Sequence, residues 1–215
     1  MLKMKPKIFF IGFNKCGTKT ISHFFKANAY RALHCRARPV VYDYLPRRFW
    51  LTGTVSAARV INSNIKKGYP VLRGLPPYRV YSDLTNVRDG QVIEACRFFR
   101  HFHREYQDSY FVLNVRPVEK WVRSRELHDG GNFIIRYSKY LGVSQEEVKD
   151  LWREMFNAHY RDAVNYFDGS QKFTVFDIEN DAPDKLVTFL REDFELDRQV
   201  WTHKGATTHR VEAQA

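Results

Sequence analysis

A short loop near the N-terminus carries the residues best suited to bind phosphate. Apolar residues 8–11 end at Gly12, and a loop containing Lys15 and Gly17 leads into a hydroxyl-rich segment that starts at Thr18. A strand that continues through such a loop into a helix presents backbone N–H groups and the positive end of the helix dipole to an anion. The predicted phosphate-binding turn consists of Lys15, Cys16, Gly17, Thr18, Lys19 and Thr20.

This turn differs from the P-loop of nucleotide kinases in the position of its lysine. In the P-loop pattern G-x-x-x-x-G-K-[ST], a lysine directly follows the second glycine and reaches the terminal phosphates. Gly12 and Gly17 have the required separation, but Thr18 stands where that lysine should be, and Lys15 precedes the second glycine. The pattern therefore favours a ligand with one 5′-phosphate in the turn and a separate anionic group beside Lys15.

A second candidate site lies about a hundred residues later. Arg116 ends the apolar run 110–115, and Ser124 follows eight positions on, in a predicted helix. Ligands of open α/β sheets bind at the carboxyl ends of strands, where a guanidinium can hold a phosphate through paired hydrogen bonds and a hydroxyl can add a third. The alternative is a surface ion pair for Arg116 and an incidental helix serine at position 124.

Strands and helices alternate along the chain. Apolar and β-branched runs predict strands over residues 8–13, 32–35, 78–82, 110–115 and 173–176. Helical spacing and capping residues predict helices over residues 18–29, 54–67, 91–106, 117–127, 144–167 and 181–194. Residues 36–53 read as irregular and 128–132 as a glycine-rich loop. This alternation predicts an α/β fold, a three-layer sandwich around a mainly parallel sheet with a P-loop-like turn, in one domain over residues 1–215.

Composition indicates a cytoplasmic enzyme with anionic ligands. The 215 residues carry a formal charge of +11 and three scattered cysteines, which predicts reduced thiols and no disulfide framework. The N-terminal apolar run is too short for a signal peptide or a membrane span. Nucleic acid is not the expected partner, because no nucleic-acid-binding motif accompanies the basic residues. A nucleotide, together with an acidic acceptor, accounts for the charge equally well.

The two candidate sites together resemble the sulfotransferase family that uses 3′-phosphoadenosine 5′-phosphosulfate (PAPS). The K-x-G-T element of that family is matched by Lys15-Cys16-Gly17-Thr18, and its strand-end arginine and later serine by Arg116 and Ser124. A weaker match is His203-Lys204-Gly205, where the family often has a Lys-Gly loop. The resemblance implies PAPS as donor, adenosine 3′,5′-bisphosphate (PAP) as product, no metal, and a 3′-phosphate site formed by Arg116, Ser124, Lys204 and Gly205.

Sulfuryl transfer needs a cation at the departing phosphate oxygen and a base for the acceptor. Lys15 is the candidate cation. Asp83, after the strand 78–82, is the first candidate base and His34 the second, although an aspartate also caps turns well and a histidine can be purely structural. The acceptor is expected to be a hydroxyl or amine of a small molecule or glycan, and residues 42–50 carry aromatic side chains and arginines that could contact it.

Two other functions fit parts of the sequence. A P-loop small-molecule kinase would use ATP and Mg²⁺, but it requires a lysine directly after Gly17 and leaves Arg116 and Ser124 unexplained. A non-catalytic protein that binds anions or RNA would use the basic surface and would not depend on one loop lysine. The three hypotheses predict different responses to PAP, to ATP with Mg²⁺ and to loss of Lys15.

Overall fold

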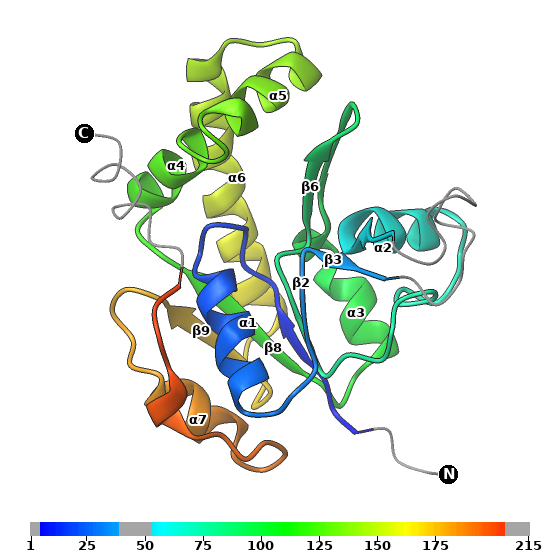
Figure 1. Ribbon diagram of the computed structural model, residues 1–215, viewed down its shortest axis with the longest axis vertical. Coiled ribbons are helices and arrows are strands. Elements are labelled where there is room, and N and C mark those ends of the chain that lie inside the picture. Colours follow the sequence, from blue (N-terminus) through cyan, green and yellow to red (C-terminus); the bar gives the residue numbers. More distant parts are fainter. Residues whose placement is uncertain (1–4, 39–52, 205–215) are drawn as a thin grey trace.

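A seven-stranded sheet forms the centre of the molecule (Figure 1). The computed structural model describes residues 5–38 and 53–204, so Gly205 and residues 42–50 lie outside the described residues. Five neighbouring strands run parallel, in the order β2 (Ala32–His34), β5 (Val80–Ser82), β1 (Ile8–Phe10), β8 (Tyr110–Val115) and β9 (Phe173–Asp177). Two short strands extend the β2 edge in antiparallel pairing, β3 (Arg36–Ala37) and β4 (Val55–Ser56). The predicted α/β fold with a mainly parallel sheet is therefore confirmed.

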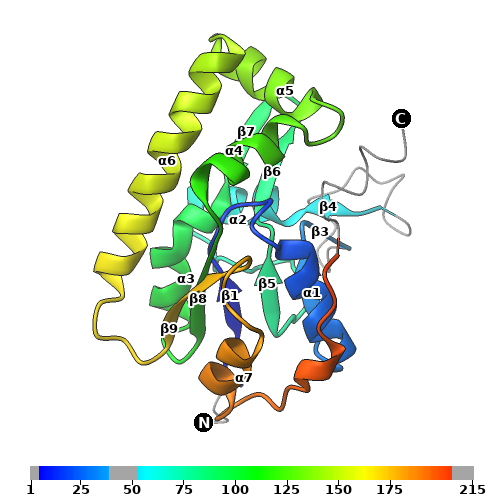
Figure 2. The same ribbon diagram turned by 90° about the vertical axis from the view of Figure 1, so that its left-hand side faces the viewer.

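Helices cover both faces of this sheet (Figure 2). One face packs against α1 (Thr18–Ala27) and α7 (Asp184–Leu190), and the other against α2 (Ala57–Lys66), α3 (Phe99–Glu105) and α6 (Gln145–Tyr166). Strand β1 shows why both faces need cover, because successive side chains of a strand point to opposite sides. Ile8 and Phe10 pack with the α1 layer, whereas Phe9 stacks on Phe102 of α3.

Strand β1 is the switch point of the sheet, because β2 and β5 lie on one side of it and β8 and β9 on the other. Helix α1, which follows β1, covers one face, while α2 and α3, which precede and follow β5, cover the other. Open α/β sheets bind ligands at such a switch point, outside the carboxyl ends of the strands. A ligand site is therefore expected among the segments that follow β1, β2, β5 and β8.

A group of helices extends beyond this carboxyl edge. Helices α4 (Val118–Glu126) and α5 (Asn132–Leu141) pack on the N-terminal half of α6 around a third apolar core that includes Trp121, Phe133 and Trp152 (Figure 1). The sequence predicted no helix at α5. The glycines that bound it, Gly131 and Gly142, both adopt left-handed conformations, which is typical of glycine at helix ends. The capping box at Ser144 and Glu147, which begins α6, is confirmed.

The predicted helix over residues 91–106 is wrong in its first part. Residues 91–94 form β7 (Gln91–Glu94), which pairs with β6 (Thr85–Arg88) in an antiparallel hairpin, and a 3-10 turn, η3 (Ala95–Phe98), then leads into α3. The turn residues Asp89 and Gly90 have φ angles of 55° and 65°. Asp-Gly favours a two-residue hairpin turn of this kind, so the turn dipeptide overrode an apolar spacing that also fits a helix.

Other boundaries also differ from the sequence prediction: β1 ends at Phe10 instead of residue 13, and the last helix, α7, is shorter than the predicted range 181–194. Residues 36–37 and 55–56 form strands where an irregular segment and a helix start were expected, and the second helix begins after Ser56 instead of Thr54. Thr54 instead accepts a hydrogen bond from Nε of Arg36, at 3.0 Å. In the described part of the chain, no helix combines the length and the apolar character needed to cross a membrane.

Candidate functional site

The loop between β1 and α1 ends in an uncapped helix N-terminus. Gly17 is the N-cap residue of α1, with φ of 72°, and no side chain caps the helix or adds an acidic group to its first turn. The first N–H groups of a helix lack intrahelical acceptors, so those of Thr18, Lys19 and Thr20 are available to an anion. Lys15 also has a left-handed φ, 69°, which turns the chain just before this N-terminus.

Asn114 on β8 determines the shape of this loop. Its side-chain oxygen accepts a hydrogen bond from the N–H of Gly12 at 2.9 Å, and its side-chain nitrogen donates one to the carbonyl oxygen of Cys16 at 2.8 Å. A Cβ atom at Gly12 would lie 1.9 Å from the carbonyl oxygen of Asn114, so only glycine fits there. An asparagine within an otherwise apolar strand was the signal for this role in the sequence, and it was not recognised. In the structure its side chain is fully buried and needs hydrogen-bond partners.

Two residues of α4 hold the middle of the loop. Nε1 of Trp121 donates to the carbonyl oxygen of Asn14 at 2.9 Å, and Nε of Arg125 donates to its side-chain oxygen at 2.8 Å. Residues four positions apart lie on one face of a helix, so both side chains reach the same loop residue. None of these three residues was predicted from the sequence, because each looks ordinary apart from its partners.

Arg125 is buried completely and depends on Glu94 of β7 for its counter-charge. The two side chains form an ion pair, and Glu94 also accepts a hydrogen bond from the Thr85 hydroxyl at 2.9 Å. Among the described residues, five aromatic rings have centroids within 5.6 Å of the guanidinium carbon: Phe13, Trp121, Phe133, Tyr137 and Trp152. A charge in such apolar surroundings needs its partner, so Glu94, Arg125 and Asn14 act together to support the loop.

Cys16 and Gly17 contribute backbone groups to the loop. Burial raises the pKa of the Cys16 thiol to about 12, so the sulfur stays protonated and is not a nucleophile. A Cβ atom at Gly17 would lie 2.2 Å from Cγ1 of Ile178, which keeps this position free of a side chain. The predicted turn is thus packed from behind, and its N–H groups face the carboxyl edge of the sheet.

The two candidate bases, predicted as alternatives, lie side by side. His34 ends β2 and Asp83 directly follows β5, and these neighbouring strands pair with His34 opposite Ser82. Nε2 of His34 is 3.3 Å from a carboxylate oxygen of Asp83 and 3.4 Å from the hydroxyl oxygen of Thr18. The pair therefore adjoins the first residue of α1.

Burial brings the proton affinities of this pair closer together. It raises the pKa of Asp83 above its usual range, against the opposing effect of His34, and it lowers the pKa of His34, against the opposing effect of Asp83. A carboxyl and an imidazole that interact at this distance influence each other's titration. Such a pair can accept a proton from a nearby hydroxyl or amine.

His128 is a further residue of this region that the sequence did not single out. It lies in the connection after α4, half-buried, with its ring packed against Phe133 at a centroid distance of 5.2 Å. Burial, and after it the charge of Lys15, lowers the pKa of His128 to about 4. The imidazole is consequently neutral at physiological pH, and Lys15 acts electrostatically on both His128 and Asp83.

Arg116 lies at the end of β8 beside the loop, in an ion pair. One terminal nitrogen donates to the carbonyl oxygen of Lys15 at 3.2 Å and the other to the carboxylate of Glu179, which also accepts from Nζ of Lys120 at 2.6 Å. Nε of Arg116 is buried and has no hydrogen-bond partner among the described residues. The carboxylate of Glu179 thus occupies a position between two cations that would also suit a phosphate.

The remaining predicted residues are spread around the loop. Lys19 is exposed on the first turn of α1, and Ser124 is largely enclosed on α4 between Trp121 and Arg125. The backbone N–H of Lys204 donates to the Thr20 hydroxyl at 2.9 Å, so the C-terminal segment reaches the start of α1. Within the described ranges, no group of three or more His, Cys, Asp or Glu residues is arranged to hold a metal ion.

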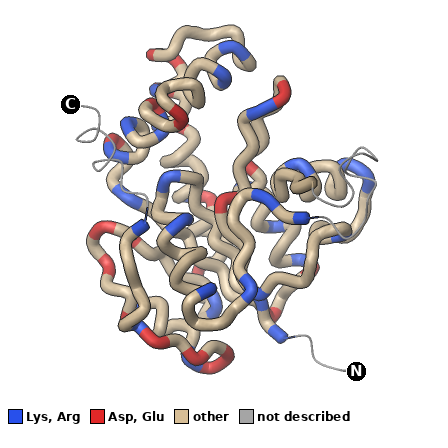
Figure 3. The backbone as a smooth tube through the Cα atoms, in the orientation of Figure 1, with Lys and Arg blue, Asp and Glu red and all other residues tan. Residues whose placement is uncertain are grey.

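Lysines and arginines lie on many elements of the fold and alternate with acidic residues (Figure 3). The distinctive feature of the loop region is therefore its combination of groups and not its charge alone. It joins an uncapped helix N-terminus, the ammonium of Lys15 and the paired side chains of His34 and Asp83. Chemically, this combination suits the transfer of an anionic group to an acceptor that loses a proton.

The sequence was also compared with known protein families and with curated proteins. No protein-family model matches the chain, and no curated protein matches it either.

Proposed function

We propose that this protein is a sulfotransferase that moves a sulfuryl group from PAPS to a hydroxyl or amine of a small-molecule or glycan acceptor. The observation that carries the proposal is the position of the His34–Asp83 pair, which adjoins the uncapped N-terminus of α1 next to the Lys15 loop. A kinase of the P-loop type needs a lysine directly after Gly17, and Thr18 takes that place.

The residues around the loop fit a nucleotide with 5′- and 3′-phosphates. The N–H groups of the first turn of α1, with the hydroxyl groups of Thr18 and Thr20, would hold the 5′-phosphate. Arg116, whose Nε lacks a partner among the described residues, would hold the 3′-phosphate once Glu179 moves aside. Ser124, Lys204 and Gly205 remain predicted contacts of that phosphate on the strength of the family resemblance.

The proposed step is an in-line displacement at sulfur. The acceptor oxygen or nitrogen forms a bond to sulfur while the bond from sulfur to the 5′-phosphate oxygen breaks, and PAP leaves with the bonding electrons. Lys15 stabilises the charge that grows on this oxygen as a compact cation. The His34–Asp83 pair takes the proton that the acceptor loses. No residue of the protein changes covalently, and no metal takes part in the step.

Ligand binding provides the test that separates the three functional hypotheses. We expect PAP to raise the thermal unfolding temperature, and to raise it further as its concentration increases, because a ligand that binds only the folded state stabilises it. ATP with Mg²⁺ should give no comparable shift. Stabilisation by ATP with Mg²⁺ and not by PAP would favour the kinase, and stabilisation by RNA alone would favour a nucleic-acid-binding protein.

Asp83→Asn is expected to slow transfer and to change its pH dependence. Loss of a general base typically costs about 10²- to 10⁴-fold in rate. Wild-type kcat/KM should fall as the pH is lowered through the apparent pKa of the pair, because the protonated pair cannot accept a proton. Asp83 opposes the lowering of the His34 pKa, so without Asp83 this acidic limb should move to lower pH. Transfer of labelled sulfate from PAPS, followed across pH, measures both effects.

Asp89→Asn is the matched control, because it removes an exposed aspartate of the β6–β7 turn that pairs only with Arg59 among the described residues. Its rate and pH profile should equal those of the wild type. An unchanged profile in Asp83→Asn would remove the carboxylate from the mechanism.

A further inference from the structure

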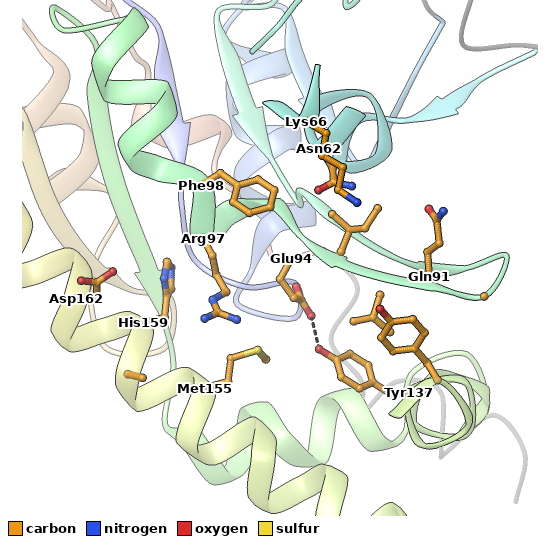
Figure 4. A pocket seen from close by; sticks show the side chains of 15 residues that line it. Asn62, Lys66, Gln91, Glu94, Arg97, Phe98, Tyr137, Met155, His159 and Asp162 are labelled. Carbon is orange, nitrogen blue, oxygen red and sulfur yellow. Dashed lines mark hydrogen bonds between the residues drawn. The ribbon is translucent and has the colours of Figure 1, made fainter. Parts of the chain in front are cut away.

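A pocket of about 740 Å³ lies against the β6–β7 hairpin. The hairpin, η3, α2, α5 and α6 form its walls (Figure 4). Its volume is within the range of sites that bind small molecules. None of the residues predicted from the sequence to form the donor or acceptor site lines it, so it is a separate place on the molecule.

The spare charge of this pocket is positive. Lys66 and Arg97 both line it, and neither forms a hydrogen bond or ion pair with another described residue. The acidic groups of the lining are already paired, since Asp162 binds Arg100 at 2.6 and 2.7 Å and Glu94 binds Arg125. In Figure 4 the guanidinium of Arg97 points between Glu94 and His159, toward the pocket. An anionic group is the natural partner for these two cations.

His159 supplies the pocket with a hydrogen-bond acceptor. Its side chain is 5% exposed, and Nε2 lies 2.7 Å from the carbonyl oxygen of Ile11. A carbonyl oxygen only accepts, so Nε2 carries the proton and Nδ1 keeps its lone pair. Nδ1 has no hydrogen-bond partner among the described residues, and burial lowers the pKa of His159, which keeps the ring neutral. A hydroxyl group of a ligand can donate to this nitrogen.

The other lining groups suit a hydroxylated ring. Phe98, Tyr137 and Tyr140 present aromatic surface, and Tyr140 is 51% exposed at the rim. Asn62 and Gln91 add side-chain amides, which both donate and accept hydrogen bonds. Apolar faces with a few directed polar groups are typical of small-molecule sites. We propose that this pocket binds a sugar that carries an anionic group, with Arg97 on the anion, Lys66 adding positive charge from the α2 wall, and His159 on a hydroxyl.

Glu94 and His159 also hold the loop through Arg125 and Ile11, so replacing either would disturb the neighbouring site. Lys66 and Arg97 are exposed and support no other described residue through hydrogen bonds. The double variant Lys66→Gln/Arg97→Gln should therefore fold normally, and its thermal unfolding checks this.

Isothermal titration calorimetry with glucose 6-phosphate, glucose 6-sulfate and glucuronate is the experiment. We expect at least one of these sugars to bind. The affinity of the double variant for that sugar should be lower by a factor of about 10, which corresponds to ~1.4 kcal/mol. Arg161→Gln, an exposed arginine of α6 outside the pocket, should bind like the wild type. Glucose and inorganic phosphate, each with half of the recognised groups, should bind more weakly than the sugar anion.

Several results would overturn the proposal. Absence of binding of all three sugars up to ~10 mM, a concentration at which even weak sites fill, would show that the pocket does not take them. Equal affinity for inorganic phosphate would remove the sugar ring from recognition. Binding that survives in Lys66→Gln/Arg97→Gln and disappears in Lys15→Ala would place the sugar at the loop instead. None of these outcomes depends on whether PAPS is the donor.

Discussion

Lys15→Ala is expected to lower kcat for sulfuryl transfer by about 10²- to 10³-fold, the usual cost of removing one group that stabilises developing negative charge. Binding of PAP should change far less, because the first-turn N–H groups and Arg116 remain in place. The backbone should also be unaffected, since Lys15 has φ of 69° and alanine meets the same steric cost there as lysine. Steady-state rates and calorimetric titration of PAP measure the two effects separately.

Two further variants sharpen this result. Lys139→Ala removes an exposed lysine from the last turn of α5 and should retain wild-type activity. Lys15→Arg keeps the charge but spreads it over a planar group, so partial recovery of kcat is expected. Full activity in Lys15→Ala would end the catalytic role of this lysine, and equal losses in Lys15→Ala and Lys139→Ala would indicate only a general effect of net charge.

Glu94→Ala is expected to lower the free energy of unfolding by about 3–5 kcal/mol, because it leaves a buried charge without its partner. Arg125 is fully buried, and its ion pair with Glu94 compensates the cost of removing the guanidinium from water. The Thr85 hydroxyl would lose its acceptor as well. Urea unfolding of the variant and the wild type measures the difference.

A second substitution separates the charge from the cavity. In Glu94→Ala/Arg125→Met the unpaired charge is gone and methionine can pack among the surrounding rings, so most of the lost stability should return. The double variant still lacks the hydrogen bond from Arg125 to Asn14, which supports the loop. Its affinity for PAP should therefore be lower than that of the wild type. A loss below about 1 kcal/mol in Glu94→Ala would mean that the guanidinium does not need its partner.

Local patterns in the sequence were sufficient for most of the fold. The strand-loop-helix unit around Gly17 and the capping box at Ser144 depend on residues that lie close together in the chain, and both are found where they were expected. The β6–β7 hairpin was not predicted, although its turn dipeptide, Asp89-Gly90, is present in the sequence. The apolar residues between 92 and 99 also have the spacing of a helix, and this pattern led to the wrong prediction. Here two local signals conflicted, and the turn prevailed.

The supports of the candidate site could not be predicted in the same way. Arg125 and Asn14 are 111 residues apart, and Arg125 and Glu94 are 31 apart, so no local pattern links them. His34 and Asp83 were predicted one at a time, and only the pairing of β2 with β5 shows that they lie in contact. Long-range pairing of this kind is a property of the folded chain, and a motif search along the sequence has no access to it.

Asn114 has a consequence for how the protein acquires its loop during folding. Its amide bridges the two ends of the loop from a strand 98 and 102 residues further along the chain. The loop can therefore reach its final shape only after β8 has docked beside β1, which requires that about half of the 215 residues have been synthesised. A peptide of residues 8–20 would contain the complete K-x-G-T element and still lack the partner that shapes it.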